Sequence, residues 1–138
     1  MAGSLLVAVV DDDASVRKAI RRLLIASNLR VVVFSSGEEF FRSIADHAPD
    51  CVILDLHMPG LTGLDVQKQL IRAGIRLPIV VVTAYDEPET REQCLAAGAA
   101  AYLQKPLDDQ VLLNAVAVAV RRSSEARPGS ETDENPES

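Results

Sequence analysis

The sequence predicts a single α/β domain built on a doubly wound, five-stranded parallel sheet. Five short runs rich in β-branched residues alternate with five helix-like segments, which is typical of βα repeats. Three of the runs are almost continuously apolar, as expected of strands that helices cover on both faces. The 138 residues, 48% of them hydrophobic, suffice for one core but are too few for the eight βα pairs of a barrel.

The predicted strands are separated by segments long enough to form helical crossovers. In chain order the strands are Leu5–Val10, Arg30–Phe34, Cys51–Leu54, Ile79–Val82 and Ala101–Leu103. Parallel neighbours need right-handed connections, and a helix between each pair of strands supplies them.

Each predicted helix carries a local signal of its start, its end or its buried face. In chain order the signals are the apolar stripe of Val16, Ile20, Leu23 and Leu24, a capping box at Ser36–Glu39, a Thr62-x-x-Asp65 start, Pro88 with a closing Gly98, and a cap at Asp108.

Charged and polar residues cluster where the predicted strands end. Asp11–Asp13 follow the first strand, Asp55 the third and Thr83 the fourth, and the fifth runs into Lys105. The second strand ends in the uncharged pair Ser35–Ser36. Ligands of open parallel sheets bind beyond the carboxyl ends of the strands, where the strand order reverses. Bringing the charged ends together places the second strand at an edge and predicts the order 2-1-3-4-5.

The predicted cluster suits phosphoryl transfer. Two carboxylates about 4–5 Å apart repel by roughly 3–4 kcal/mol at an effective dielectric constant of about 20. A hard divalent cation such as Mg²⁺, held by Asp11, Asp12 and Asp55, would relieve that repulsion. With the ammonium of Lys105 and the hydroxyl of Thr83 nearby, the Asp55 carboxylate is the expected nucleophile.

Simpler roles account for some residues near these strand ends. Asp13 is expected to cap the first helix, because an aspartate before a helix commonly accepts its free N–H groups. His57 is interpreted as a loop residue, since two histidines in the whole chain do not indicate an imidazole-based metal site.

Composition argues against direct nucleic-acid binding and against a membrane span. The 14 basic and 20 acidic residues leave a net charge of −6, which repels phosphodiester backbones. The apolar runs are far shorter than the roughly 20 residues that cross a bilayer. Cys51 and Cys94 lie in no paired motif and are expected to be reduced thiols, which fits a cytoplasmic location.

The C-terminal part divides into an apolar helix and a polar segment. We expect the folded domain to span residues 1–120 and residues 121–138 to form a disordered polar tail, because Ala126 is its one apolar residue. In the last helix, Leu113, Ala117 and Val120 share a face. This face is either an exposed surface for a partner or second copy, or part of an unusually wide buried surface.

The motifs at the strand ends resemble those of the receiver domains of two-component response regulators, over about residues 5–120. The wording is closest to receivers of the nitrogen-fixation regulator type. The matching motifs are Val10-Asp11-Asp12, Asp55-Leu56-His57-Met58-Pro59 with Gly63, Val82-Thr83-Ala84, Gly98-Ala99, Tyr102 and Lys105-Pro106.

The resemblance implies a flavodoxin-like (βα)5 fold and a phosphoacceptor signalling domain rather than an enzyme. Asp55 would take a phosphoryl group from a histidine kinase or a phosphotransfer protein. Mg²⁺ would be held by Asp12, Asp55 and the backbone carbonyl of His57, with Asp11 acting through water. A bulky Tyr85 would slow hydrolysis of the product, unless it points into solvent.

The resemblance also implies how a signal would leave the site. Thr83 and Lys105 would bind phosphoryl oxygens, and Tyr102 would change rotamer when Thr83 moves. The Lys105–Pro106 peptide bond is expected to be cis. The surface of the fourth helix, fifth strand and fifth helix would then switch, controlling a downstream protein or a homodimer.

Three other interpretations predict different residues. A phosphatase of the haloacid-dehalogenase type needs an acid two residues after its nucleophile, where this chain has His57. A flavin or nucleotide module needs a first turn rich in Gly, Ser or Thr, and three aspartates stand there. A scaffold that is never phosphorylated does not need Asp12, Asp55 and Lys105.

Overall fold

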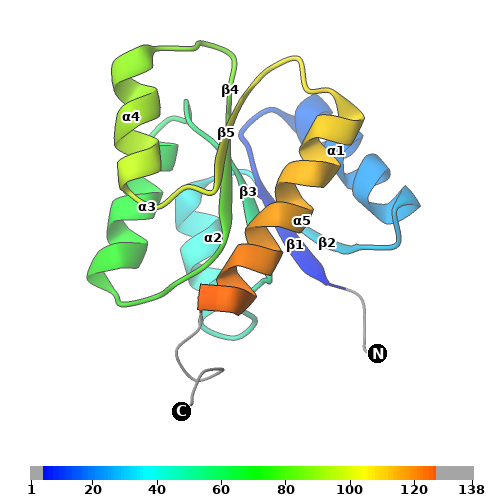
Figure 1. Ribbon diagram of the computed structural model, residues 1–138, viewed down its shortest axis with the longest axis horizontal. Helices are drawn as coiled ribbons and strands as arrows, with labels where there is room; N and C mark the ends of the chain where they lie inside the picture. The colour runs from blue at the N-terminus through cyan, green and yellow to red at the C-terminus, as the bar shows by residue number, and fades with distance from the viewer. Residues whose placement is uncertain (1–4, 127–138) are drawn as a thin grey trace.

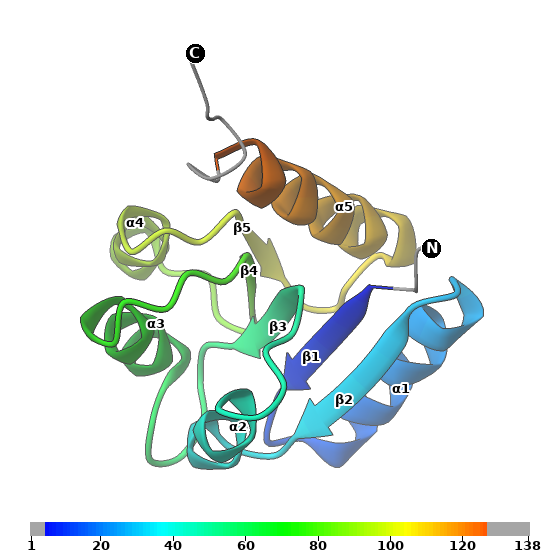
Figure 2. The same cartoon turned by 90° about the horizontal axis from the view of Figure 1, so that it is seen from below.

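The computed structural model describes residues 5–126 and has five parallel strands in the order β2-β1-β3-β4-β5, with helices on both faces of the sheet (Figures 1 and 2). The predicted fold class and strand order are confirmed. The strands are β1 (Leu6–Val10), β2 (Arg30–Phe34), β3 (Cys51–Asp55), β4 (Ile79–Thr83) and β5 (Ala101–Gln104). The helices are α1 (Ala14–Ala26), α2 (Gly37–Ile44), α3 (Gly63–Arg72), α4 (Pro88–Ala96) and α5 (Asp109–Ala126).

Two apolar layers hold the helices to the sheet. Helices α1 and α5 cover one face, and α2, α3 and α4 cover the other (Figure 2). Alternate residues of β1 point to the two layers: Val7 and Val9 pack under α1 and α5, while Ala8 and Val10 pack under the other three helices. The central strands are buried on both faces, so their sequences read as continuous apolar runs.

Strands β3 and β4 each extend one residue beyond the predicted end. Asp55 pairs in register with Val82, and Thr83 pairs with Gln104, so these two polar residues are the last of their strands rather than the first of loops. Their backbones are therefore held by the sheet, which fixes the starting point of both side chains.

The predicted helix starts are mostly confirmed, with one change of partner. Asp13 caps α1 by accepting from the Ser15 amide, and Thr62 forms the predicted capping box with Asp65. Ser36 caps α2, but Glu39 accepts its reciprocal hydrogen bond from the Ser35 amide rather than from Ser36. The box signal located the helix start correctly, and the extended backbone before it offered the nearer donor.

The predicted boundary at residue 120 falls too early for the last helix. Helix α5 continues to Ala126, because Arg121 to Ala126 are ordinary helix residues that need no apolar face to propagate an existing helix. The rest of the predicted tail lies outside the described residues.

Two of the three residues in the predicted apolar stripe of α5 are partly buried. Leu113 and Val120 pack against the layer that α5 shares with α1, and only Ala117 is exposed. Wide burial, rather than an exposed stripe, therefore describes this helix face.

Gly63 allows α3 to begin against the end of β3. Its amide donates to the Leu56 carbonyl at 2.9 Å, and a Cβ at this position would lie 2.6 Å from the Asp55 carbonyl oxygen. That contact is with backbone, so it cannot be relieved by rotating a side chain.

We predict that Gly63→Ala lowers the free energy of unfolding by about 2–3 kcal/mol, as overpacking against fixed backbone does. Gly74→Ala is the matched control, because Gly74 has a φ of +72° with nothing near its missing Cβ; left-handed strain alone should cost about 1 kcal/mol there. Urea unfolding measures both, and equal losses would contradict the clash.

Candidate functional site

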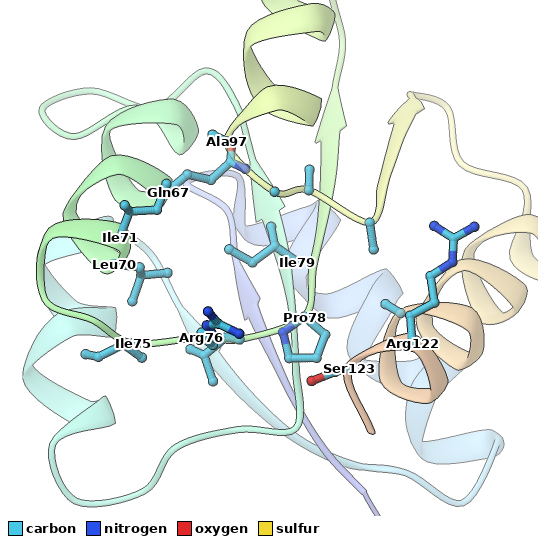
Figure 3. A pocket seen from close by; sticks show the side chains of 15 residues that line it. Gln67, Leu70, Ile71, Ile75, Arg76, Pro78, Ile79, Ala97, Arg122 and Ser123 are labelled. Atoms are coloured by element: carbon cyan, nitrogen blue, oxygen red, sulfur yellow. The ribbon is translucent and has the colours of Figure 1, made fainter. Parts of the chain in front are cut away.

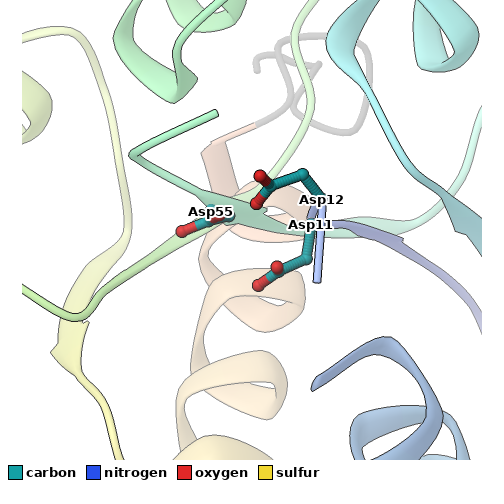
Figure 4. Close-up of side chains that lie close together, drawn as sticks. All are labelled: Asp11, Asp12 and Asp55. Atoms are coloured by element: carbon teal, nitrogen blue, oxygen red, sulfur yellow. The ribbon is translucent and has the colours of Figure 1, made fainter. Parts of the chain in front are cut away.

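Three aspartates meet at the carboxyl edge of the sheet. Asp11 and Asp12 follow β1, and Asp55 ends the neighbouring strand β3; one carboxylate oxygen from each lies within 4.8 Å of the others (Figure 4). Asp11 and Asp55 are buried, with exposed fractions of 1% and 3%, whereas Asp12 is exposed. The cluster predicted from the strand ends is therefore present, with one member open to solvent.

Lys105 joins the cluster from the end of β5. Its Nζ lies 2.9 Å from Asp11 Oδ2 and 3.4 Å from Asp55 Oδ1. The predicted cis bond between Lys105 and Pro106 is present. One ammonium thus contacts two buried carboxylates, so the cluster keeps an excess of negative charge.

Arg17 stabilises the turn that carries the aspartates, a role that the sequence did not predict. Its Nη1 donates to the Asp11 carbonyl at 2.7 Å, while Asp11 Oδ1 accepts from the Asp13 amide at 2.9 Å. Together these bonds fix both the backbone and the carboxylate of Asp11. A basic residue one turn into the helix after the aspartates was the only available signal.

Thr83 stands at the same edge but does not contact Asp55 in this conformation. Its buried hydroxyl donates to the Tyr85 carbonyl at 3.0 Å and accepts from the Tyr85 amide at 3.1 Å. The hydroxyl therefore stabilises the loop between β4 and α4. Because a hydroxyl has one proton to donate, a hydrogen bond from Thr83 to a group on Asp55 requires the bond to the Tyr85 carbonyl to be given up.

The rings of His57 and Tyr85 meet edge to face across the mouth of the site, with centroids 5.5 Å apart. Tyr85 is nevertheless 68% exposed. The sequence allowed a Tyr85 ring that shields the site or one that points into solvent. The ring does part of each, because it contacts His57 while most of its surface is exposed.

Tyr102 lies on β5 with its ring against the layer under α2, α3 and α4. Its phenol oxygen is buried and makes no hydrogen bond of ordinary length and angle within residues 5–126. Burial raises the pKa of Tyr102, although the Glu87 backbone lies close enough to oppose the shift. The Arg91 guanidinium, paired with Asp86 at 2.6 Å, lies 5.4 Å from the ring centroid, so α4 and β5 touch through this ring.

Burial and charge set the protonation of the cluster. Burial, followed by the nearby charge of Asp11, raises the pKa of Asp55 to about 7, although Lys105 opposes the shift. Burial alone would lower the pKa of Lys105, but its hydrogen bond to Asp11 and the charge of Asp55 raise it. The Lys105 side chain therefore remains charged, whereas about half of the Asp55 carboxyl groups carry a proton at pH 7.

The donor set fits a hard divalent cation. Three carboxylates supply only oxygen ligands, which Mg²⁺ prefers, and the exposed Asp12 gives access from solvent. A cation there would offset the negative charge that one lysine leaves uncompensated.

A family model described as "Response regulator receiver domain" matches residues 7–117. The chain belongs to the response regulator receiver family. This confirms the resemblance and sets aside the phosphatase and flavin-module interpretations. Receiver domains use Mg²⁺ at an acidic pocket and are generally phosphorylated by histidine kinases, and the three aspartates form such a pocket here.

Relatives and solved structures agree with this assignment. The chain is 36% identical to Nodulation protein W of Bradyrhizobium diazoefficiens over 94% of its length and 57% of the relative's. It is 42% identical to Response regulator MprA of a Mycobacterium species, over 94% and 54% of the two chains. It thus spans about half the length of these curated relatives.

Among solved structures, a response regulator receiver protein from Burkholderia phymatum has a TM-score of 0.76 at 44% identity, covering 86% of this receiver and 96% of that chain. The structure described as FixJ-N has a TM-score of 0.80 at 27% identity, covering 88% and 96%. Within the part of the receiver that the structure describes, no helix has both the length and the apolar character needed to cross a bilayer.

We predict that Asp55→Asn stabilises the receiver in a pH-dependent way. In the unfolded chain an aspartate titrates near 3.9, so between about pH 4 and 7 the folded state retains a proton that the unfolded state has lost. Stability of the wild type therefore falls as pH rises through this window. The variant should gain about 2–4 kcal/mol at pH 8, in metal-free buffer, and almost nothing at pH 4.

Asp46→Asn is the matched control, because it removes the same charge from an exposed loop position. Its effect should stay within about 0.5 kcal/mol at every pH. Thermal unfolding followed by circular dichroism measures both variants. A gain for Asp55→Asn that does not change between pH 4 and 8 would rule out the raised pKa as its cause.

Proposed function

We propose that this receiver accepts a phosphoryl group on Asp55 from the phosphohistidine of a histidine kinase or phosphotransfer protein, with Mg²⁺ required. The observation that carries the proposal is the buried Asp55 carboxylate, 3.4 Å from the Lys105 ammonium and grouped with Asp11 and Asp12. The receiver would act as a phosphoacceptor signalling domain rather than as an enzyme with a separate substrate.

In the transfer step, an Asp55 carboxylate oxygen attacks phosphorus, and the new P–O bond forms as the P–N bond of the phosphohistidine breaks. The electron pair of the broken bond returns to the imidazole of the donor, which takes a proton from solvent. Bound Mg²⁺, held by Asp11, Asp12, Asp55 and the carbonyl of His57, would favour the ionised carboxylate and neutralise the phosphoryl oxygens.

Besides Mg²⁺, the site has a positive charge of its own in the Lys105 ammonium. Its contacts with Asp11 and Asp55 place the ammonium beside the oxygen that becomes phosphorylated. A phosphoryl oxygen on Asp55 would compete with Asp11 for that ammonium, so the lysine would orient the product as well as the nucleophile.

The signal would leave through Thr83 and Tyr102. Once Asp55 is phosphorylated, the Thr83 hydroxyl would give up the bond that it donates to the Tyr85 carbonyl and donate to a phosphoryl oxygen instead. That exchange would free the loop before α4. Tyr102, whose phenol makes no hydrogen bond of ordinary geometry within the described chain, would repack against the moved loop and carry the change to α4, β5 and α5.

The receiving partner would be a downstream protein or a second copy bound to the α4–β5–α5 surface. The relatives named above are about twice as long, and they are described as response regulators or nodulation proteins. A net charge of −6 makes direct nucleic-acid binding by this chain unfavourable, and we propose a cytoplasmic location, where histidine-kinase phosphodonors occur.

We predict that acetyl phosphate with Mg²⁺ adds one phosphoryl mass to the full chain, measured by intact mass spectrometry. Asp55→Asn should show no adduct, and omitting Mg²⁺ should remove most of it, because the carboxylates then repel the phosphodonor. Asp46→Asn, which lies in an exposed loop, should react like the wild type. Equal modification of Asp55→Asn would assign the reaction to another residue.

We predict that Thr83→Ala still takes the phosphoryl group but no longer transmits it. Amide chemical shifts along α4, β5 and α5 should change on phosphorylation of the wild type and of Thr83→Ser, which keeps the hydroxyl. In Thr83→Ala most of the coupling, on the order of 1–3 kcal/mol, should be lost. Shift changes on phosphorylation of Thr83→Ala that are as large as those of the wild type would exclude this route through Thr83.

A further inference from the structure

A cavity of about 460 Å³ opens at the amino-terminal edge of β4 and β5, at the end of the sheet opposite the aspartates (Figure 3). It lies between the carboxyl-terminal parts of α3 and α5 and the connection from α4 to β5, and its volume is within the usual range for small-molecule sites. Its apolar wall is formed chiefly by Leu70, Ile71, Ile75, Pro78 and Ile79.

Short side chains between α4 and β5 create this space. Ala97–Ala100 line the cavity with small residues only, and Gly98 has a φ of +98° with nothing within 4 Å of a Cβ placed there. The connection therefore turns without filling the gap between α3 and α5. The cavity exists because Ala97 and Ala100 are small; a larger apolar residue at either position would fill part of it.

A buried, unpaired hydrogen-bond acceptor lies in the same wall. Gln67 is 1% exposed, and its Nε2 donates to the Cys94 carbonyl at 3.0 Å. A carbonyl accepts only, so the amide must present its nitrogen to Cys94 and turn Oε1 away. Gln67 Oε1 has no partner among residues 5–126, and Figure 3 shows this side chain reaching from α3 towards Ala97 at the cavity wall.

Positive charge stands at the mouth. Arg76 follows α3 and Arg122 belongs to the last turns of α5; both line the cavity, are exposed, and form no ion pair with another described residue. Ile71, 59% exposed, continues the apolar wall outwards. The cavity therefore combines an apolar interior, an acceptor without a donor and two arginines, all three polar groups unpaired within the described part of the chain.

We propose that this cavity binds a small amphipathic acid: an apolar chain or ring that carries a hydroxyl or amine donor at one end and a carboxylate at the other. The donor would bind Gln67 Oε1, which buried polar groups require, and the carboxylate would lie between Arg76 and Arg122. A purely apolar ligand would leave the Gln67 acceptor unpaired, and a purely polar one would not cover the isoleucine and leucine wall.

The first test compares three ligands on the full chain by ¹H–¹⁵N NMR titration. The probe is ω-hydroxydecanoate; decanoate lacks the donor, and decanol lacks the carboxylate. We expect saturable shifts confined to Ala97–Ala100, Ser123 and the Gln67 side-chain amide, with a Kd on the order of 0.1–1 mM for a ligand of about 13 heavy atoms. Decanoate should bind about 3–10-fold more weakly, and decanol about 2–5-fold more weakly at low salt.

Variants assign each preference to its residue. Gln67→Leu should abolish the preference for ω-hydroxydecanoate over decanoate, while the double variant Arg76→Gln, Arg122→Gln should abolish the preference for ω-hydroxydecanoate over decanol. Arg21→Gln, the same charge change on exposed α1, should alter neither. Ala97→Leu fills the cavity and should remove saturable binding of all three ligands.

Equal affinities for ω-hydroxydecanoate and decanoate on the wild-type chain would mean that water satisfies Gln67 Oε1, and would overturn the proposal without any variant. Shifts scattered over the surface, or binding that survives Ala97→Leu, would overturn it as well. None of the lining residues belongs to the aspartate cluster. The titration is therefore decided independently of whether Asp55 takes a phosphoryl group.

Discussion

The site of this receiver depends on the two ion pairs that Lys105 makes with the buried carboxylates of Asp11 and Asp55. Two carboxylates buried at one edge of the sheet share a single ammonium, so neither is fully compensated. Burial, followed by the nearby charge of Asp11, raises the pKa of Asp55 to about 7, and the excess negative charge makes this edge attractive to a divalent cation. Folding energy from two apolar layers keeps these groups in place.

The parallel sheet brings the residues of this site together from distant parts of the chain. All five strands end at the same edge, so residues distant in sequence meet there: Asp11 and Lys105 are 94 residues apart and 2.9 Å from contact atom to contact atom. Thr83 ends β4, the strand beside Asp55, and its hydroxyl is bonded to a loop; Tyr102 lies on β5, one strand further along the sheet.

The opposite edge of the sheet has a different character. It carries an apolar cavity with two arginines at its mouth instead of a cluster of aspartates. In the wall of this cavity, Gln67 of α3 donates a hydrogen bond to the Cys94 carbonyl of α4. A ligand at this edge would contact α3, α5 and the connection between α4 and β5, and the last two also belong to or adjoin the proposed signalling surface. The two ends of the domain thus offer chemically separate sites joined by the rigid strands β4 and β5.

The sequence by itself determined the strand order, the helix caps at Asp13 and Thr62, and the identity of the charged cluster. These depend on local patterns: apolar runs, capping residues, and polar residues at strand ends. Only the tertiary structure decided the bond from Arg17 to Asp11, the burial of Leu113 and Val120, and the unpaired oxygen of Gln67. Each of these depends on which helix face meets which neighbour, because burial and hydrogen-bond partners across elements follow from packing distances that no local pattern encodes.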